Sequence, residues 1–129
     1  VKTEKLLLPQ VEETEKKVAE YFPVQKFDSM ALVSRKMETA VQNAMDHLEN
    51  MPVPDVKEAN AFKAGFMKYF RFMKSVYTGY RKVAEAKTEE ERARYLQEVQ
   101  RIPDKRLEAL NEIKAVQQKY ADANGFKIQ

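Results

Sequence analysis

ANAFKAGFMKYFRFMKSVYTGYRKV, residues 59–83, is the most strongly patterned segment of the 129-residue chain. Its apolar residues recur at alternating intervals of three and four: Ala59, Phe62, Phe66, Tyr69, Met73, Val76, Tyr80 and Val83. This heptad spacing places them on one face of an α-helix. Phe70 and Tyr77 lie beside them and widen the seam into the stripe of a globular bundle. We therefore predict a helix over about residues 55–86 whose aromatic face lies in an all-α core.

The helix before this segment is expected over residues 28–50, with Asp28 or Ser29 as its N-cap. With Asp28 as the cap, Phe27 and Leu32 have the spacing of a hydrophobic staple. Its apolar residues again follow helical spacing: Met30, Val33, Met37, Val41, Ala44, Leu48 and Met51. This second stripe is the expected partner of the aromatic face.

Prolines mark the first helix and the connection to the third. Pro9 suits the first turn of a short helix over residues 9–22, because a proline there loses no hydrogen bond, and Pro23 ends it. The connector over residues 51–54 contains two prolines and is short enough to reverse the chain. Asp55, with a glutamate three residues on, resembles a capping box for the third helix.

A fourth helical segment begins at Thr88, which has a glutamate three residues on and therefore also forms a capping box. Pro103 removes a backbone donor and is expected to kink or split this helix, with Asp104 able to cap a new start. Gly125 matches a C-terminal stop, with Phe126 placed to pack near the last turn. The apolar residues of this half are Tyr95, Leu96, Val99, Ile102, Leu107, Leu110, Ile113, Val116 and Tyr120.

These elements predict one domain over residues 1–129. Its fold class is all-α, an antiparallel, left-handed up-and-down four-helix bundle, with a short first helix and a fourth helix kinked or split at Pro103. The seams on the second and third helices predict shallow crossing angles of about 20°. Gly65 and Gly79 lie near the apolar stripe, where a missing side chain allows close helix approach.

Composition excludes several kinds of chemistry. The chain has no cysteine, so disulfides and thiolate sites are excluded, and His47 is its one histidine, too few for a di-iron or multi-histidine zinc site. The longest aliphatic run, over residues 30–33, is far below the ~20 residues that a membrane span needs. Paired carboxylates lie in predicted first turns, where the helix dipole accounts for them. We expect no enzyme activity, no cofactor, no metal and no transmembrane span.

The third helix carries a basic face. Between residues 59 and 84 it has no acidic residue and six basic ones: Lys63, Lys68, Arg71, Lys74, Arg81 and Lys82. These side chains spread over the side opposite the aromatic seam and form a candidate site for an anionic membrane surface or polyanion. The alternative, which we favour, is pairing with glutamates of the first and fourth helices. Nucleic acid is not expected as the partner, because aromatic and basic residues lie on different faces.

The aromatic and methionine side chains are a second candidate site. An interhelical pocket for a hydrophobic small molecule would be lined by Phe62, Phe66, Tyr69, Phe70, Met73, Tyr77, Tyr80 and Met37. The same residues at heptad spacing are what a bundle core needs, and this second interpretation is favoured. His47 precedes the apolar Leu48 and is expected to be a partly exposed structural residue.

Residues 70–77 and 120–127 give the chain an overall layout that resembles small helical-bundle proteins exported by bacteria, often surface or periplasmic lipoproteins of unknown function. The resemblance implies export and a non-catalytic role, and it transfers no functional residue. A lipid anchor would need an upstream cysteine. The resulting hypothesis is an exported, non-enzymatic structural or interaction module. A cytoplasmic location, the partner and the oligomeric state stay open.

Overall fold

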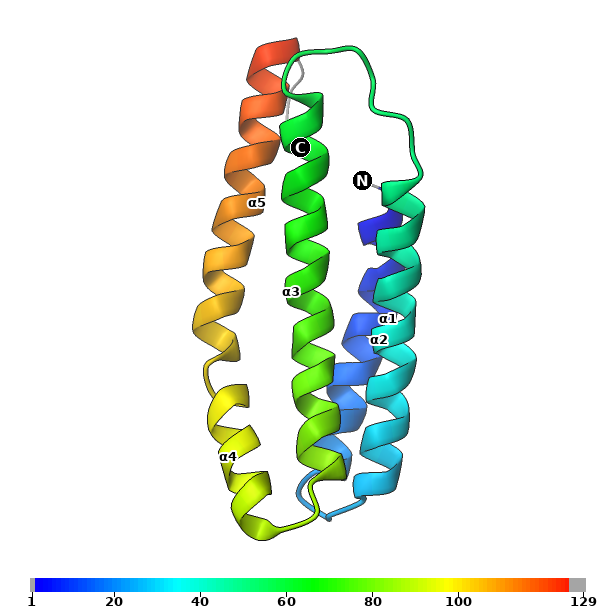
Figure 1. Ribbon diagram of the computed structural model, residues 1–129, viewed down its shortest axis with the longest axis vertical. Coiled ribbons are helices and arrows are strands. Elements are labelled where there is room, and N and C mark those ends of the chain that lie inside the picture. Colours follow the sequence, from blue (N-terminus) through cyan, green and yellow to red (C-terminus); the bar gives the residue numbers. More distant parts are fainter. Residues whose placement is uncertain (1, 126–129) are drawn as a thin grey trace.

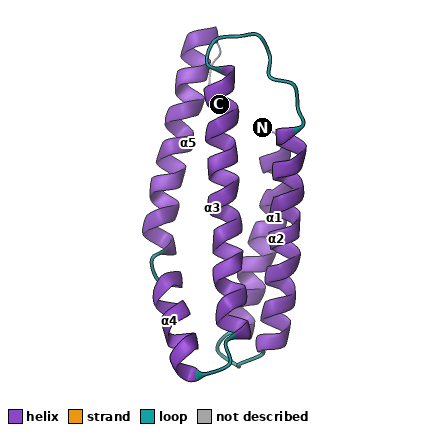
Figure 2. Cartoon of the chain, in the orientation of Figure 1, coloured by secondary structure: helices purple, strands orange, loops and turns teal. Residues whose placement is uncertain are grey.

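A computed structural model describes the backbone of residues 2–125 and the side chains of residues 7–125. Five helices follow one another in the order α1 (Lys2–Tyr21), α2 (Phe27–Glu49), α3 (Ala59–Glu85), α4 (Glu89–Val99) and α5 (Ile102–Asn124). Residues 2–125 contain no strand (Figure 2). The helices run along the long axis of the molecule, and α3 lies between α2 and the α4–α5 pair (Figure 1). The predicted all-α bundle is confirmed.

The fourth helix of the bundle is made of α4 and α5, which meet at an angle of 33°. Helix α4 ends at Val99, and Pro103 lies in the first turn of α5, where its missing N–H costs no helical hydrogen bond. The chain therefore divides just before the proline, as predicted. Arg101, not Asp104, occupies the N-cap position of α5, so that part of the prediction is wrong. At the other end, Gly125 adopts a φ of +73° and terminates α5 as expected, whereas Phe126 lies outside the described residues.

Helix α1 is longer than the sequence predicted. It begins at Lys2, so Pro9 lies inside the helix and does not open it. The reason is visible in the packing, because Leu7 is buried in the core and continues the stripe formed by Val11, Thr14 and Val18. Burial of a leucine stabilises by about 1.5–3 kcal/mol, which is comparable to the cost of about 3 kcal/mol of a proline inside a helix.

The starts of α2 and α3 also differ from the prediction. Lys26 occupies the N-cap position of α2, and Leu32 is 55% exposed, so the staple does not form. The ring of Phe27 instead lies 6.3 Å from that of Phe22, which closes the α1–α2 turn. Helix α3 begins at Ala59 after Glu58 in the left-handed conformation, four residues later than predicted from Asp55. Two prolines hold the preceding connector away from helical geometry.

The core follows the aromatic face of α3. Phe66, Phe70 and Tyr77 are at most 1% exposed, and they share one cluster with Met37 and Val41 of α2. Four of the eight seam residues are fully buried: Ala59, Phe66, Val76 and Val83. The other four are half-buried: Phe62, Tyr69, Met73 and Tyr80. The centre of burial is therefore rotated toward the α2 side of α3, where the helix contact is most extensive.

Helix α4 buries no residue of its own and is held by Arg92. The Arg92 guanidinium donates hydrogen bonds to the backbone oxygens of Val83 (3.2 Å) and Ala86 (3.0 Å) at the end of α3. It also lies 4.0 Å from the centre of the Phe27 ring, a cation–π contact. At the N-terminus of α4, the Thr88 hydroxyl accepts a hydrogen bond from the Glu91 N–H at 3.0 Å, as predicted. These contacts fix α4 beside α3.

Helices α3 and α5 approach closely at Gly65. A Cβ atom at Gly65 would lie 2.9 Å from Cγ1 of Val116, whereas a Cβ at Gly79 would lie 3.5 Å from Cγ2 of Val99. The first distance requires a stiff β-branched side chain to move, and the second is an ordinary contact. The predicted close approach is therefore found at Gly65.

These two glycines make a matched pair of variants. Gly79→Ala should raise the free energy of unfolding by about 0.5–1 kcal/mol, because alanine favours the helix. Gly65→Ala should give no such gain, because the contact with Val116 offsets it, and adding Val116→Ala should restore part of the gain in a double-mutant cycle. Urea denaturation measures the parent, Gly79→Ala and the three variants of the cycle, Gly65→Ala, Val116→Ala and the double variant. Equal stabilisation by Gly65→Ala and Gly79→Ala would contradict the close approach.

Candidate functional site

The six predicted cations of α3 do not form one group. Lys63 Nζ donates to the backbone oxygens of Glu49 (2.9 Å) and Met51 (3.2 Å), so it caps the C-terminal end of α2. Lys68 pairs with Glu112 of α5 at 2.8 Å, and both side chains are more than half exposed. Such an exposed pair contributes about 0–1 kcal/mol. Both lysines therefore have roles in joining helices.

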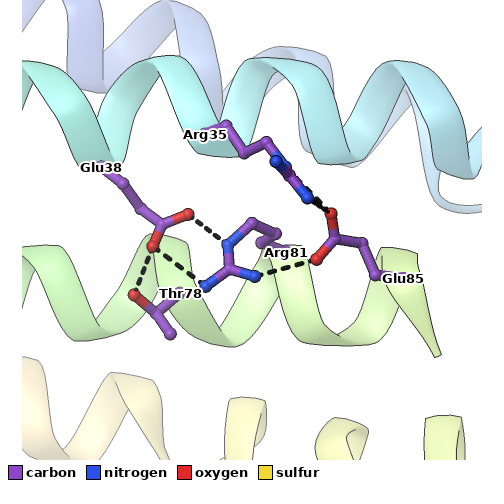
Figure 3. A network of polar contacts seen from close by, with 5 residues as sticks. All are labelled: Arg35, Glu38, Thr78, Arg81 and Glu85. Atoms are coloured by element: carbon purple, nitrogen blue, oxygen red, sulfur yellow. Dashed lines mark hydrogen bonds and ion pairs between the residues drawn. The ribbon is translucent and has the colours of Figure 1, made fainter.

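Arg81 belongs to a network that joins α2 and α3 (Figure 3). Its guanidinium donates to Glu38 at 2.5 Å and to Glu85 at 2.8 Å. Glu38 also accepts a hydrogen bond from the Thr78 hydroxyl at 2.7 Å, and Arg35 pairs with Glu85 on the other side. The hydrogen bonds that Arg81 donates to Glu38 and Glu85 raise the pKa of Arg81, and the bonds that Glu85 accepts from Arg35 and Arg81 lower the pKa of Glu85. Two carboxylates thus neutralise two guanidinium groups.

The other three cations meet in a surface groove of about 580 Å³, here called the basic groove. Arg71, Lys74 and Lys82 line it from α3, and Lys105 lines it from α5. One carboxylate, Glu98, is part of the same lining. The walls are formed by α2 on one side and by the α4–α5 junction on the other: Gln42, Met45, Val99 and Ile102. Four cations thus face a hollow that contains a single acid.

The cations of the basic groove differ in how they are held. Lys74 Nζ donates to Gln42 Oε1 at 2.7 Å, and Lys82 Nζ lies 5.8 Å from the centre of the Tyr95 ring. Within residues 7–125, the side chains of Arg71 and Lys105 make neither a hydrogen bond nor an ion pair, and both are exposed. Two positive charges at the groove are therefore without a partner among the described side chains.

Lys105 is the residue that sequence reasoning missed. Its position in the groove depends on the rotation of α5 about its own axis after the break at Pro103, which no spacing rule on α3 reveals. Among the described side chains, the predicted pairing of α3 cations with glutamates of the first and fourth helices is found only for Lys68, which pairs with Glu112 of α5. Arg81 pairs with Glu38 of α2 and with Glu85 of its own helix, and Glu15 of α1 pairs with Arg106 of α5 at 2.7 Å.

The residues of the predicted hydrophobic pocket pack on one another. Met37 and Tyr77 are at most 2% exposed, and the rings of Phe62 and Phe66 lie 4.9 Å apart. Phe66 and Phe70 are 6.3 Å apart, and Tyr77 and Tyr80 are 5.9 Å apart. Tyr69 and Met73 pack against the same cluster and are half-buried. These side chains fill the space that a small molecule would need, which favours the core interpretation.

The polar atoms near this cluster are engaged between helices. The Tyr80 hydroxyl donates to Glu15 of α1 at 3.0 Å, and Arg106 of α5 donates to the same carboxylate. Burial, together with the negative charge of Glu15, raises the pKa of both Tyr77 and Tyr80 far above the usual value. Both phenols therefore stay neutral and serve packing.

The described residues were also compared with the requirements of a metal site and of a membrane-spanning helix. His47 is exposed on α2, as expected. Among residues 2–125, histidine and carboxylate side chains nowhere gather in a group of three able to hold a metal ion. In the same range, every helix is too polar or too short to span a bilayer.

Comparisons with protein-family models, with curated proteins and with solved structures gave no match to this chain. The resemblance to exported bacterial bundles therefore stays a prediction.

The network around Glu85 predicts a pH-dependent contribution to stability. Because folding lowers the pKa of Glu85 below its ordinary value of 4.5, its contribution is present above about pH 4.5 and is lost as the pH falls through the folded value. Glu85→Gln should lower the free energy of unfolding by about 0.5–1 kcal/mol at neutral pH, since the groups are partly exposed.

Urea denaturation at a series of pH values measures this effect. The difference between Glu85→Gln and the parent should shrink as the pH falls below about 4.5. Glu12→Gln, at an exposed position in the middle of α1, is the matched control and should show no difference at any pH. A Glu85→Gln deficit that stays constant down to about pH 2 would contradict the charge network.

Proposed function

We propose that this protein is a non-enzymatic interaction module that binds an anionic partner in the basic groove. The proposal joins two hypotheses drawn from the sequence, an interaction module and an anion binder that uses α3. The observation that carries it is the convergence of Arg71, Lys74, Lys82 and Lys105 on one hollow, opposite one carboxylate.

Electrostatics supports this proposal. Arg71 and Lys74 are three residues apart, so their backbones differ by about 4.5 Å along the helix axis. This separation is below the Debye length of about 10 Å at 0.1 M salt, so neighbouring groove cations repel one another and jointly attract an anion. The other cations of α3 bond to groups outside the groove. An added negative charge is therefore attracted most strongly to the groove cations.

The polar groups of the groove support a binding role more than a catalytic one. The Ser75 hydroxyl donates to the Phe72 carbonyl at 2.6 Å, and the Thr78 hydroxyl donates to Glu38. The Ser75 proton is directed to a backbone carbonyl, which is no general base, and the carboxylate that accepts the Thr78 proton is already held by the Arg81 guanidinium. A carrier role for hydrophobic molecules is less well supported, because the aromatic cluster is filled by its own side chains.

Export forms part of the proposal and is supported by the resemblance to exported bacterial bundles. Cell fractionation with an antibody against the purified protein tests it. Recovery outside the cytoplasm supports export, and recovery with cytoplasmic markers would remove this part of the proposal without affecting the groove.

Charge reversal tests the anion site. Arg71→Glu/Lys82→Glu/Lys105→Glu should weaken binding to heparin or to phosphatidylglycerol vesicles by at least about tenfold at low salt, because three favourable contacts become repulsive. Binding by the parent protein should weaken steeply as salt is added. Isothermal titration calorimetry measures both effects.

The control reverses three exposed lysines outside the groove: Lys16→Glu/Lys36→Glu/Lys114→Glu. Both triple variants have the same net charge, so a general charge effect would weaken them equally. Equal loss in the two variants, or no binding of either probe to the parent at low salt, would refute the proposal.

A further inference from the structure

We infer that the partner of the basic groove is an extended polyanionic glycan that lies along α3. This inference rests on the proposed function and names the class of its ligand. Three features of the groove carry it: its concave shape, the distribution of its charges along the helix, and the hydrogen-bonding state of its uncharged polar groups.

The shape favours a strand over a flat surface. The cations of α3 lie between a wall on α2, formed by Gln42 and Met45, and a wall at the α4–α5 junction, formed by Val99 and Ile102. Lys74 is half-buried between these walls and donates to Gln42. A planar bilayer would reach the exposed rim but not this lysine, whereas a narrow strand can enter the groove.

The charges are spread along a line. Arg71 and Lys82 are eleven residues apart on α3, which corresponds to about 16 Å along the helix axis. Lys74 lies between them along the helix, and Lys105 adds a charge from α5. A single phosphate or carboxylate cannot contact both ends. A chain with repeated negative charges can contact all the cations along this line.

The uncharged polar groups favour a partner that donates hydrogen bonds as well as carrying negative charge. Since the Ser75 and Thr78 hydroxyl protons are already donated to Phe72 O and Glu38, the free lone pairs of these oxygens can only accept. The free hydroxyl groups of a glycan supply such donors, whereas a phosphodiester oxygen cannot.

The apolar part of the lining agrees with this class of ligand. Phe72, half-buried on α3, and Val99 on α4 both line the groove, so the C–H face of a sugar can pack against either of them. A single-stranded nucleic acid would instead need exposed rings for successive bases to stack on. Phe72 is the one aromatic residue in the described lining of the groove, which disfavours that alternative.

Heparin fragments of graded length are the probe, with phosphatidylmethanol vesicles and oligothymidine as comparisons, all titrated at low salt. Affinity for the fragments should rise with fragment length until a fragment spans about 16 Å, and longer fragments should then bind with the same affinity per site. Ser75→Ala should weaken fragment binding by about threefold, because one acceptor is lost, and should leave vesicle binding unchanged, because the phosphatidylmethanol headgroup carries no hydrogen-bond donor. Ser29→Ala, on α2, is the matched control.

The outcomes separate the two proposals. Vesicle or oligothymidine binding as tight as fragment binding, with no dependence on fragment length and no effect of Ser75→Ala, would overturn the glycan inference and leave the anion-binding function standing. No binding of any of the three probes would refute the proposed function itself. Length-dependent fragment binding that is sensitive to Ser75→Ala supports both.

Discussion

The packing of the α3 aromatic face against α2 is the interaction on which the rest of the structure depends. Phe66, Phe70 and Tyr77 together with Met37 and Val41 form the centre of the core, and each is at most 2% exposed. Truncating a buried aromatic side chain of this kind typically costs about 3–5 kcal/mol, a large part of the total stability of a domain this size. This packing fixes the rotation of α3 about its axis. The side of α3 that carries Arg71, Lys74 and Lys82 then points away from this core and lines the basic groove.

The groove exists because the neighbours of α3 are held at defined distances. On the α2 side, the Glu38–Arg81–Glu85 network occupies one cation and ties the two helices together. On the other side, Gly65 lets α5 approach closely, while the break before Pro103 turns α4 relative to α5 by 33°. The uncompensated charges of the groove are therefore the cations that pair with no acidic residue among the described side chains of a neighbouring helix.

Sequence reasoning succeeded where the signal is local to one helix. The heptad spacing of α3, the Thr88 cap and the Gly125 stop each depend on residues within a few positions of one another. Helix α1 was predicted too short because the local rule for Pro9 was given more weight than the burial of Leu7, which depends on tertiary packing. The site was only partly predictable for the same reason. Arg81 pairs with a residue of α2, and Lys105 lines the groove from α5. Both contacts depend on how the neighbouring helices are rotated about their axes, and the residue spacing along one helix does not determine those rotations.

We propose that the two faces of α3 have separate roles: the inward face holds the bundle together, and the outward face forms a groove that binds an anion. An amide and methyl NMR titration with a heparin fragment tests both faces in one measurement. We expect chemical-shift changes at Arg71, Ser75, Lys82 and Lys105, with the methyl signals of Met37 and Val41 unchanged. Changes concentrated in those core methyls, or on the outer surface of α1, would contradict the account.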